Sequence, residues 1–185
     1  MEQRAAQEDW ESGEYSVERD ILNAKFCTWI PIFSAYSAVI LLHSIVETQL
    51  RAFAEHMGEK RDLKLRVKDM AGRGVEQSAL YLDRVPSVPV KMDSAWCSVR
   101  DLQSLRNIIV HRGGKSGERR GQKKEMERLV KKYPQELQFQ KADGIHDQLW
   151  VSMKLCRSFV GIISEFFERV FKSAGLPNRY GQLGS

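Results

Sequence analysis

The longest uncharged stretch of the chain runs from Phe26 to Val46 and covers 21 residues. A helix that crosses a membrane needs about 20 apolar residues, so its length alone allows such a span. However, the stretch is the only one of its kind, and polar residues interrupt it at Thr28, Ser34, Ser37, His43 and Ser44. We therefore expect the central helix of a soluble bundle, buried on nearly all sides, with a membrane helix as the alternative.

The whole chain has the composition of a soluble globular protein. Its 42% hydrophobic and 29% charged residues exclude a disordered or fibrous chain, and its 185 residues fit one domain. We expect a flexible lead-in over residues 1–15, a helical domain over 16–174 and a disordered tail over 175–185. The lead-in does not resemble a secretory signal, and Cys27, Cys97 and Cys156 are expected to be buried, reduced thiols. The expected location is the cytoplasm.

The hydrophobic periodicity predicts an all-α fold, a helical bundle with four to five helices. The expected helices cover about 16–57, 74–85, 93–111 and 151–173. Pro31 should end or kink the first of these, and Gly58 should close it. The Asp143-Gly144 pair between two short alternating runs indicates one small β-hairpin near residues 136–150.

The helix expected over 93–111 has two distinct faces. At about 100° per residue, one arc is apolar and must face the core; it contains Ala95, Val99, Leu102, Leu105 and Ile109. The opposite face carries polar residues, namely Arg100, Ser104, Asn107 and His111. Gly113 and Gly114 then stop the helix.

Arg106 does not fit this division, because it lies only about 40° from the centre of the apolar arc at Leu102. A buried guanidinium without a partner would be costly, so Arg106 must bind an anion, meet a partner chain or reach water along its stem. Functional sites tend to occur where local rules are broken in this way. An arginine at the edge of the arc that reaches water explains the position equally well.

The segment Arg106-Asn107-Ile108-Ile109-Val110-His111 resembles the HEPN ribonuclease motif. That motif is an arginine, usually followed by Asn, Asp or His, with a histidine after four to six intervening residues. The setting is similar too, because the motif closes an amphipathic helix, a basic loop follows, and a long hydrophobic helix ends the domain. The resemblance to small stand-alone HEPN proteins covers about Asp20 to Phe171. Some HEPN toxins carry a tyrosine two residues after the histidine, where this chain has Gly113.

The resemblance implies a metal-independent RNA endonuclease that uses no cofactor. HEPN domains pair as homodimers that join two motifs in one composite cleft, and they typically leave a cyclic phosphate and a 5′-hydroxyl. Many act as toxins or antiviral effectors, which implies an antitoxin or a larger defence complex as a further partner. By this resemblance, Arg106, Asn107 and His111 are the catalytic residues.

These residue types suit the chemistry. Cleavage through the 2′-hydroxyl needs proton removal there and proton delivery to the leaving oxygen, and imidazole can do both near neutral pH. Arginine presents a fork of donors to the phosphate oxygens as they gain charge. On one continuous helix, however, Arg106 and His111 lie about 140° and about 7.5 Å apart. They converge within one chain only if the helix ends before His111, and two chains about a two-fold axis would ease this.

The net charge of +5 is partly concentrated after the motif. The residues expected to bind the RNA backbone are Arg100, Arg112, Lys115, Arg119, Arg120, Lys123 and Lys124. Glu118, Glu125 and Glu127 are interleaved with them, so a solvated helix face is an equal alternative.

The remaining candidates for chemistry are scattered. Glu47, Glu55 and Asp101 do not cluster, so a two-metal nuclease is not expected. His43 and His56 are expected to be structural. The sequence therefore leaves three functions to compare. They are an RNA endonuclease that acts through the motif, a non-catalytic helical dimer that binds RNA or a partner protein, and a membrane-associated protein that uses Phe26 to Val46.

Overall fold

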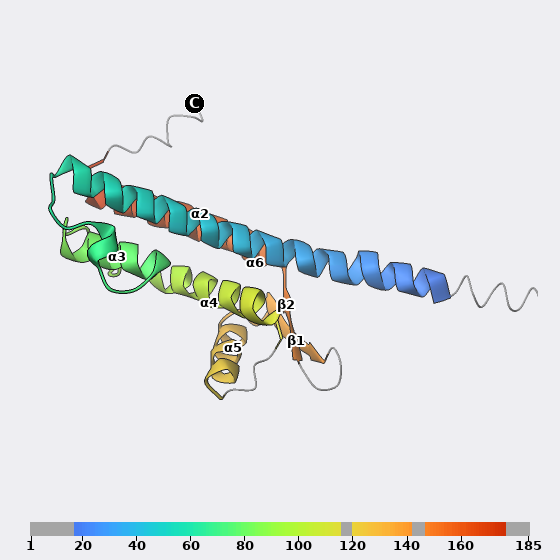
Figure 1. The fold of residues 1–185 in the computed structure, drawn as a ribbon. Helices are drawn as coiled ribbons and strands as arrows, with labels where there is room; N and C mark the ends of the chain where they lie inside the picture. Colours follow the sequence, from blue (N-terminus) through green and yellow to red (C-terminus); the bar gives the residue numbers. More distant parts are fainter. Residues whose placement is uncertain (1–16, 116–119, 142–146, 177–185) are drawn as a thin grey trace, which may run out of the picture.

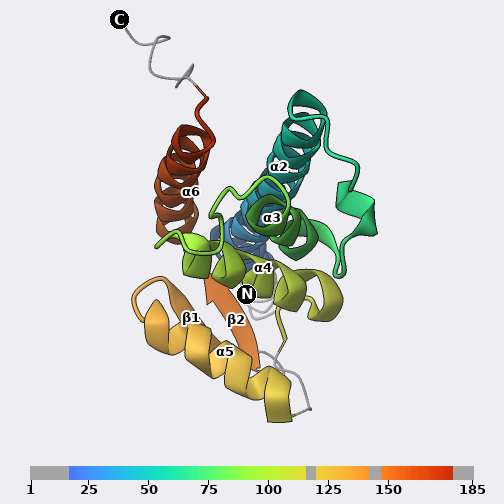
Figure 2. The same cartoon turned by 90° about the vertical axis from the view of Figure 1, so that its left-hand side faces the viewer.

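The computed structural model describes residues 17–115, 120–141 and 147–176, and there the chain is an all-α bundle with one small hairpin (Figure 1). Two long helices, α2 (Ile30–Lys60) and α6 (Met153–Ser173), lie side by side, and α3 (Gly74–Arg84) and α4 (Trp96–Arg112) lie against them. Beside the carboxyl end of α4 lie α5 (Arg120–Lys132) and the strands β1 (Leu137–Lys141) and β2 (Asp147–Val151) (Figure 2). The expected fold class is confirmed. The lead-in over 1–15 and the tail beyond residue 176 fall outside the described residues.

The first helix is continuous across Pro31. The chain is helical from residue 17, passes through a π-helical turn at Ala24–Trp29, and continues as α2. Pro31 lies in the first turn of α2, where its missing N–H costs little. The helix does not end at Pro31 as expected, and the π-helical turn lies just before it. At the other end, α2 continues past Gly58 to Lys60, so closure at Gly58 was wrong. Gly58 instead makes room for Tyr81, whose hydroxyl lies 2.5 Å from where a Cβ would be.

Only one side of α2 is buried, which corrects the expectation of a helix covered on nearly all sides. The inner side is fully buried at Ala35, Val39, Val46, Leu50 and Ala54. The outer side exposes large apolar side chains by 45–61%, namely Ile30, Phe33, Leu41 and Ile45. The sequence could not show this, because a helix that is apolar all round has no periodicity to mark its covered side.

The other half of the core comes from α6. Ser152 caps this helix by accepting from the Leu155 N–H at 3.3 Å. Its core-facing stripe is buried and consists of Leu155, Phe159, Ile163, Phe166 and Val170. α6 runs parallel to α2, since Cys156 Sγ lies 3.7 Å from the Ala35 carbonyl and the rings of Phe53 and Phe171 are 4.9 Å apart. Burial of each such side chain stabilises the fold by about 1.5–3 kcal/mol, so this stripe holds the two long helices together.

The strands β1 and β2 form the predicted hairpin. They pair antiparallel, with Leu137 opposite Val151 and Phe139 opposite Leu149. The Asp143-Gly144 turn lies outside the described residues. Lys115 forms an isolated bridge with Gln148 of β2, so the chain that leaves α4 lies along the hairpin and ties it to the end of that helix.

The cysteines only partly follow expectation. Cys156 is buried, and burial raises the pKa of its thiol. Cys27 and Cys97 are exposed, so the expectation of three buried thiols was wrong for two of them. Cys97 lies about 140° from Leu102, the centre of the apolar arc of α4, and Cys27 lies in the π-helical turn Ala24–Trp29.

Candidate functional site

The motif lies at the carboxyl end of α4. The predicted apolar arc is buried, with Val99, Leu102, Leu105 and Ile109 each at most 5% exposed. On the polar face His111 is exposed and Asn107 is half-buried. The helix ends after Arg112, where Gly113 and Gly114 have φ values of 59° and 81°. Glycine adopts this left-handed region without strain, so the two glycines stop the helix as expected.

Side chains from α2 and β2 hold the turn that follows the motif. The Tyr36 hydroxyl donates to the Leu149 carbonyl. Gln148 Nε2 donates to Tyr36 Oη and to the Gly113 carbonyl, each at 2.8 Å. A Cβ on Gly114 would collide with the Tyr36 hydroxyl, so this close approach requires glycine. The end of α4 is therefore fixed against two other elements.

Arg106 is half-buried and lies where α4 meets α2. Its Nη1 donates to Asn107 Oδ1 at 3.0 Å. On the α2 side, His43 is 5% exposed and its Nδ1 lies 3.8 Å from Glu47 Oε2. Burial lowers the pKa of His43, Glu47 opposes this shift, and the charge of Arg106 adds to it. The described residues offer no hydrogen-bond partner to the buried Nε2 of His43. Four polar side chains thus gather at the junction of α2 and α4.

The α2 half of this cluster was missed at the level of sequence. His43 was expected to be structural, and Glu47 was one of several scattered carboxylates. Their spacing of four residues did place them on one face of a helix. Only the packing of α4 against α2 shows that Arg106 meets that face. His56, the other histidine expected to be structural, is exposed near the far end of α2.

One chain does not bring Arg106 and His111 together. α4 continues through His111 to Arg112, so the condition for convergence within one chain, a helix that ends before His111, is not met. On this continuous helix the two residues lie about 140° apart around the axis. Arg106 is next to α2, whereas His111 is exposed on the face away from the core. A site that uses both residues needs the motif of a second chain.

The residues expected to bind RNA lie in different settings. Arg100 is exposed, and its Nε lies 3.4 Å from Glu76 Oε1. Arg112 is half-buried with Nη1 3.9 Å from Met126 Sδ of α5, and burial lowers the pKa of its guanidinium. Arg112 therefore contributes to packing between helices.

The other five expected RNA contacts follow α4. The exposed ones are Lys115, Lys123 and Lys124. Arg119 lies outside the described residues, and Arg120 is described only as the first residue of α5. Lys123 and Lys124 are thus exposed on α5, while Arg100 contacts Glu76 and Arg112 contacts Met126.

An ion network joins α5 to the other flank of α4. Asp101 is 2% exposed and accepts from the Tyr133 hydroxyl at 2.9 Å and from Lys132 Nζ at 2.5 Å. Arg128 Nη2 lies 2.7 Å from Asp101 Oδ1 and 2.8 Å from Glu125 Oε1. The hydrogen bond from Arg128 lowers the pKa of Glu125 to about 2. A hollow of about 370 Å³ is lined by Asp101, Glu125, Arg128 and Lys132, together with Cys97, Arg100 and Ser104. Three basic and two acidic side chains therefore face it.

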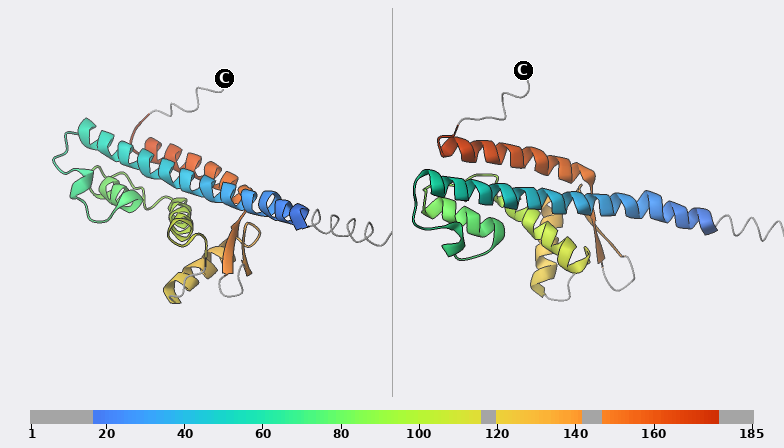
Figure 3. Two further views of the ribbon diagram at one scale, coloured as in Figure 1. Left: turned by 45° about the vertical axis from the view of Figure 1, so that its right-hand side comes forward. Right: turned by 45° about the horizontal axis from the view of Figure 1, so that its top comes forward.

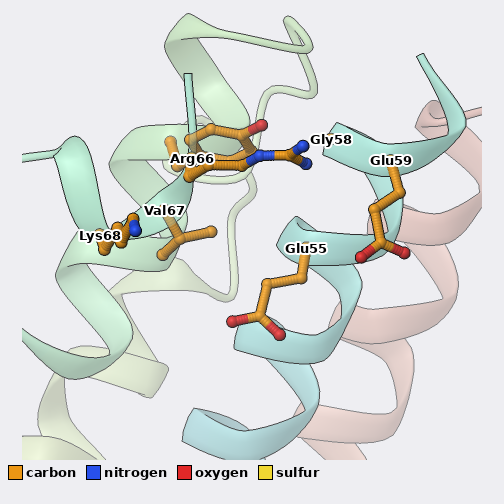
Figure 4. Close-up of a pocket in the computed structure, with 7 residues that line it drawn as sticks. Glu55, Gly58, Glu59, Arg66, Val67 and Lys68 are labelled. Atoms are coloured by element: carbon orange, nitrogen blue, oxygen red, sulfur yellow. The ribbon is translucent and has the colours of Figure 1, made fainter. Parts of the chain in front are cut away.

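The hollow in Figure 4 lies near the carboxyl end of α2, away from the motif. It measures about 380 Å³ and is lined by Glu55 and Glu59 from α2 and by Arg66 and Lys68 at the turn η2 (Val67–Asp69). Tyr81 also lines it and donates its hydroxyl to the Leu65 carbonyl at 3.0 Å. Two acidic and two basic side chains balance, so this hollow favours neither an anionic nor a cationic ligand.

The part of the chain that the structure describes contains no group of three or more side chains that could hold a metal ion. α2 is long and apolar enough to cross a membrane, with a mean hydropathy of 1.6 in its most apolar window, and 33% of that window is buried in the bundle. Core helices of soluble proteins pass the same test, so this property is weak evidence for a membrane.

Comparisons of the chain with protein-family models, curated proteins and solved structures find no match in any of the three. The resemblance to HEPN ribonucleases therefore depends on Arg106 to His111 and on their position at the end of α4.

Proposed function

We propose that this chain is a metal-independent RNA endonuclease whose active site joins the motifs of two copies. Arg106, Asn107 and His111 carry the reaction. The observation that supports this most is the setting of His111, an exposed imidazole at the end of a helix whose last turn is held by Tyr36 and Gln148. A catalytic group must be held in a defined place, and these contacts fix the backbone that carries it.

The chemistry follows from the groups present. His111 takes the proton from the 2′-hydroxyl, and the 2′-oxygen attacks the adjacent phosphorus. The bond from phosphorus to the 5′-oxygen breaks, and the imidazolium returns a proton to that oxygen. The products are a 2′,3′-cyclic phosphate and a 5′-hydroxyl. The partner's Arg106 binds the non-bridging phosphate oxygens, where charge develops, and its Asn107 orients the guanidinium.

Most N–H donors of the Arg106 guanidinium are available to bind a phosphate. Within the described chain it forms no ion pair, and its one hydrogen-bond partner is the neutral amide of Asn107. A guanidinium has five N–H donors, so most of them remain for a phosphate. Arg128, by contrast, is already paired with Asp101 and Glu125.

The test is cleavage of a single-stranded RNA by the purified chain in EDTA, followed on a denaturing gel. Wild type should cut, and His111→Ala should lose at least about 100-fold in rate because the general base is gone. His56→Ala is the matched control, since His56 is also exposed on a helix but lies away from the motif. Equal cleavage by wild type and His111→Ala, both folded by circular dichroism, would sink the proposal.

A second candidate, RNA binding without cleavage, is favoured by the exposed Lys123 and Lys124 of α5. It predicts salt-sensitive RNA binding that weakens in the Lys123→Gln/Lys124→Gln double variant. It also predicts no product on the gel and no effect of His111→Ala. Product formation that depends on His111 would exclude it.

We further propose that the nuclease acts in the cytoplasm as a toxin or antiviral effector, as the family resemblance implies, under the control of an antitoxin or a larger complex. Expression of wild type should then inhibit growth. His111→Ala expressed at the same level should not inhibit growth. If both proteins inhibit growth, the toxicity does not come from RNA cleavage and the proposed role is contradicted.

A further inference from the structure

The chain between α2 and α3 is strongly basic. Residues 60–73, which we call the basic loop, contain six cations and two anions and so have a net charge of +4, compared with +5 for the whole chain. The six cations are all exposed, namely Lys60, Arg61, Lys64, Arg66, Lys68 and Arg73. A local excess of exposed cations is the usual footprint of a surface that binds a nucleic-acid backbone.

Most cations of the basic loop have no charged partner. Arg61 donates its Nη1 to the Pro86 carbonyl, and the other five cations form no ion pair with any residue that the structure describes. By contrast, Arg128 and Lys132 of α5 are both paired with Asp101. The charge of the basic loop is therefore available to an anionic ligand, whereas much of the charge on α5 is used within the fold.

The backbone of the basic loop is held in one shape by contacts with the bundle. The Arg66 N–H donates to Asp69 Oδ2 at 2.8 Å, and the Leu65 carbonyl accepts from the Tyr81 hydroxyl at 3.0 Å. Between these contacts Val67 is buried in the core. A surface that is ordered before it meets its ligand loses less conformational entropy on binding, so these contacts favour binding by the basic loop.

The basic loop leaves the carboxyl end of α2 and runs back along this helix to the junction with α4 (Figures 1 and 3). The residue that follows it is Gly74, where a Cβ would lie 3.0 Å from Glu47 Oε1. Glu47 is in turn next to His43, whose pKa is lowered by the charge of Arg106. One end of the basic loop therefore lies beside the residues that meet Arg106.

Carboxylates near the basic loop restrict where a phosphate could lie. Glu55 and Glu59 of α2 face the hollow of Figure 4, which Arg66 and Lys68 line from the other wall. No ion pair joins the two walls in the described chain. The two carboxylates repel a phosphate from the hollow itself, so an anionic strand must follow the outer edge of the basic loop, where the cations are exposed.

The basic loop offers little to a membrane. Among residues 60–73, all of which the structure describes, the one exposed large apolar side chain is Leu65. Attachment to a membrane surface uses an apolar face in addition to cations. Exposed cations without such a face fit the phosphates of a nucleic acid better than a lipid surface.

We propose that the basic loop is a second RNA-binding surface, which holds the phosphates of single-stranded RNA to one side of the bond that is cut. From Glu47 to Lys60, α2 rises by about 20 Å at about 1.5 Å per residue. A stacked strand advances by about 3.4 Å per nucleotide, so the basic loop covers about six nucleotides beside Arg106. RNA as the substrate rests on the proposed function, whereas the binding of an anionic strand does not.

Fluorescence anisotropy with a labelled oligouridylate of about 20 nucleotides tests the binding. The 2′-hydroxyls of this probe are methylated, so it cannot be cut. Arg66→Gln/Lys68→Gln should bind it at least about 10-fold more weakly than wild type in about 0.1 M salt, and the slope of log affinity against log salt should become shallower by about 1.4. Lys60→Gln/Lys64→Gln, which removes two other unpaired cations of the basic loop, should have the same effect.

The matched control is Arg157→Gln/Lys172→Gln. These two residues are also one arginine and one lysine, they are exposed on α6, and they form no ion pair within the described chain. This variant has the same net charge as Arg66→Gln/Lys68→Gln, and it should keep the affinity and the salt slope of wild type.

Cleavage of two RNA lengths tests the position of the surface. A stacked tetranucleotide spans about 14 Å and is too short to reach from the cleaved bond to the middle of the basic loop, so Arg66→Gln/Lys68→Gln should cut it as wild type does. With unmodified RNA of about 20 nucleotides, the same variant should raise KM by about 10-fold and leave kcat unchanged, because it loses binding that substrate and transition state share.

Equal binding of the probe by wild type and both loop variants overturns the proposal, and so does an equal loss in the α6 control. If the loop variants lose binding to phosphatidylserine vesicles but not to RNA, the basic loop belongs to a lipid surface and the proposal is wrong. Binding that depends on the basic loop without any cleavage removes the nuclease and keeps this site. Cleavage of the long RNA with an unchanged KM removes this site and keeps the nuclease.

Discussion

The two flanks of α4 both bury ionisable groups, but in different ways. On the α5 flank, the buried carboxylate of Asp101 is paired with Arg128 and Lys132. On the α2 flank, His43 Nε2 has no partner among the described residues and Arg106 has only a neutral amide. Unpaired buried polar groups lower stability. We infer that the α5 flank serves the fold and that the α2 flank serves a ligand.

The largest expected difference between the flanks is in activity. Arg106→Ala should lower the cleavage rate by about 10²–10³-fold, since it removes the charge opposite the phosphate oxygens. Arg106→Lys should recover little, because an ammonium lacks the planar fork. Cleavage rates measured alongside urea unfolding check this. The assignment of the α2 flank fails if Arg106→Ala unfolds the chain or leaves the rate unchanged.

On the α5 flank the expected effect is on stability. Asp101→Asn removes the charge from hydrogen bonds to Lys132 and Arg128 and should cost about 1.5–3 kcal/mol, measured by urea unfolding. Glu165→Gln is the control, because its pair with Arg169 is on the surface and should cost less than about 0.5 kcal/mol. The rate per folded molecule should not change in either variant. If Asp101→Asn lowers the cleavage rate as much as Arg106→Ala does, the proposed difference between the two flanks is contradicted.

The smallest expected effect is the pH dependence of His43. Burial, helped by Arg106 and opposed by Glu47, lowers the pKa of His43 in the folded chain below its usual 6.5. As the pH falls, the unfolded chain therefore binds a proton on His43 at a higher pH than the folded chain does. The contribution of His43 to the free energy of unfolding is fully present above pH 6.5, and it is lost as the pH falls from there toward the folded pKa. The free energy of unfolding should fall by at most about 1.4 kcal/mol per pH unit in this range.

Urea midpoints for wild type and His43→Gln, followed from neutral pH down to about pH 5, measure this effect. The variant should show a shallower fall than wild type. Parallel curves would mean that His43 is not the group that titrates on this flank.

The fold was largely predictable from the sequence because its signals are local. The spacing of Leu155, Phe159 and Ile163 gave α6, and paired glycines at 113 and 114 gave the end of α4. The polar face with His111 followed from the helical period alone. Each of these signals lies within a few turns of helix or one short loop.

The parts that could not be predicted depend on contacts between distant segments. Asp101 is buried because Arg128 and Lys132, on a different helix, supply its partners. His43 and Glu47 join Arg106 only through the packing of α4 on α2. The exposure of Phe33 and Leu41 could not be read from a helix that is apolar on all sides.

The central claim is that Arg106 of one chain acts with His111 of the other. Two mixed dimers test it most directly, each isolated through a different tag on each chain. A dimer of Arg106→Ala with His111→Ala keeps one such pair across the two chains, whereas a dimer of wild type with the double variant keeps a pair only within one chain. The first should cut RNA at about half the wild-type rate and the second should be inactive. The reverse result, cleavage by the second dimer and none by the first, would contradict the account.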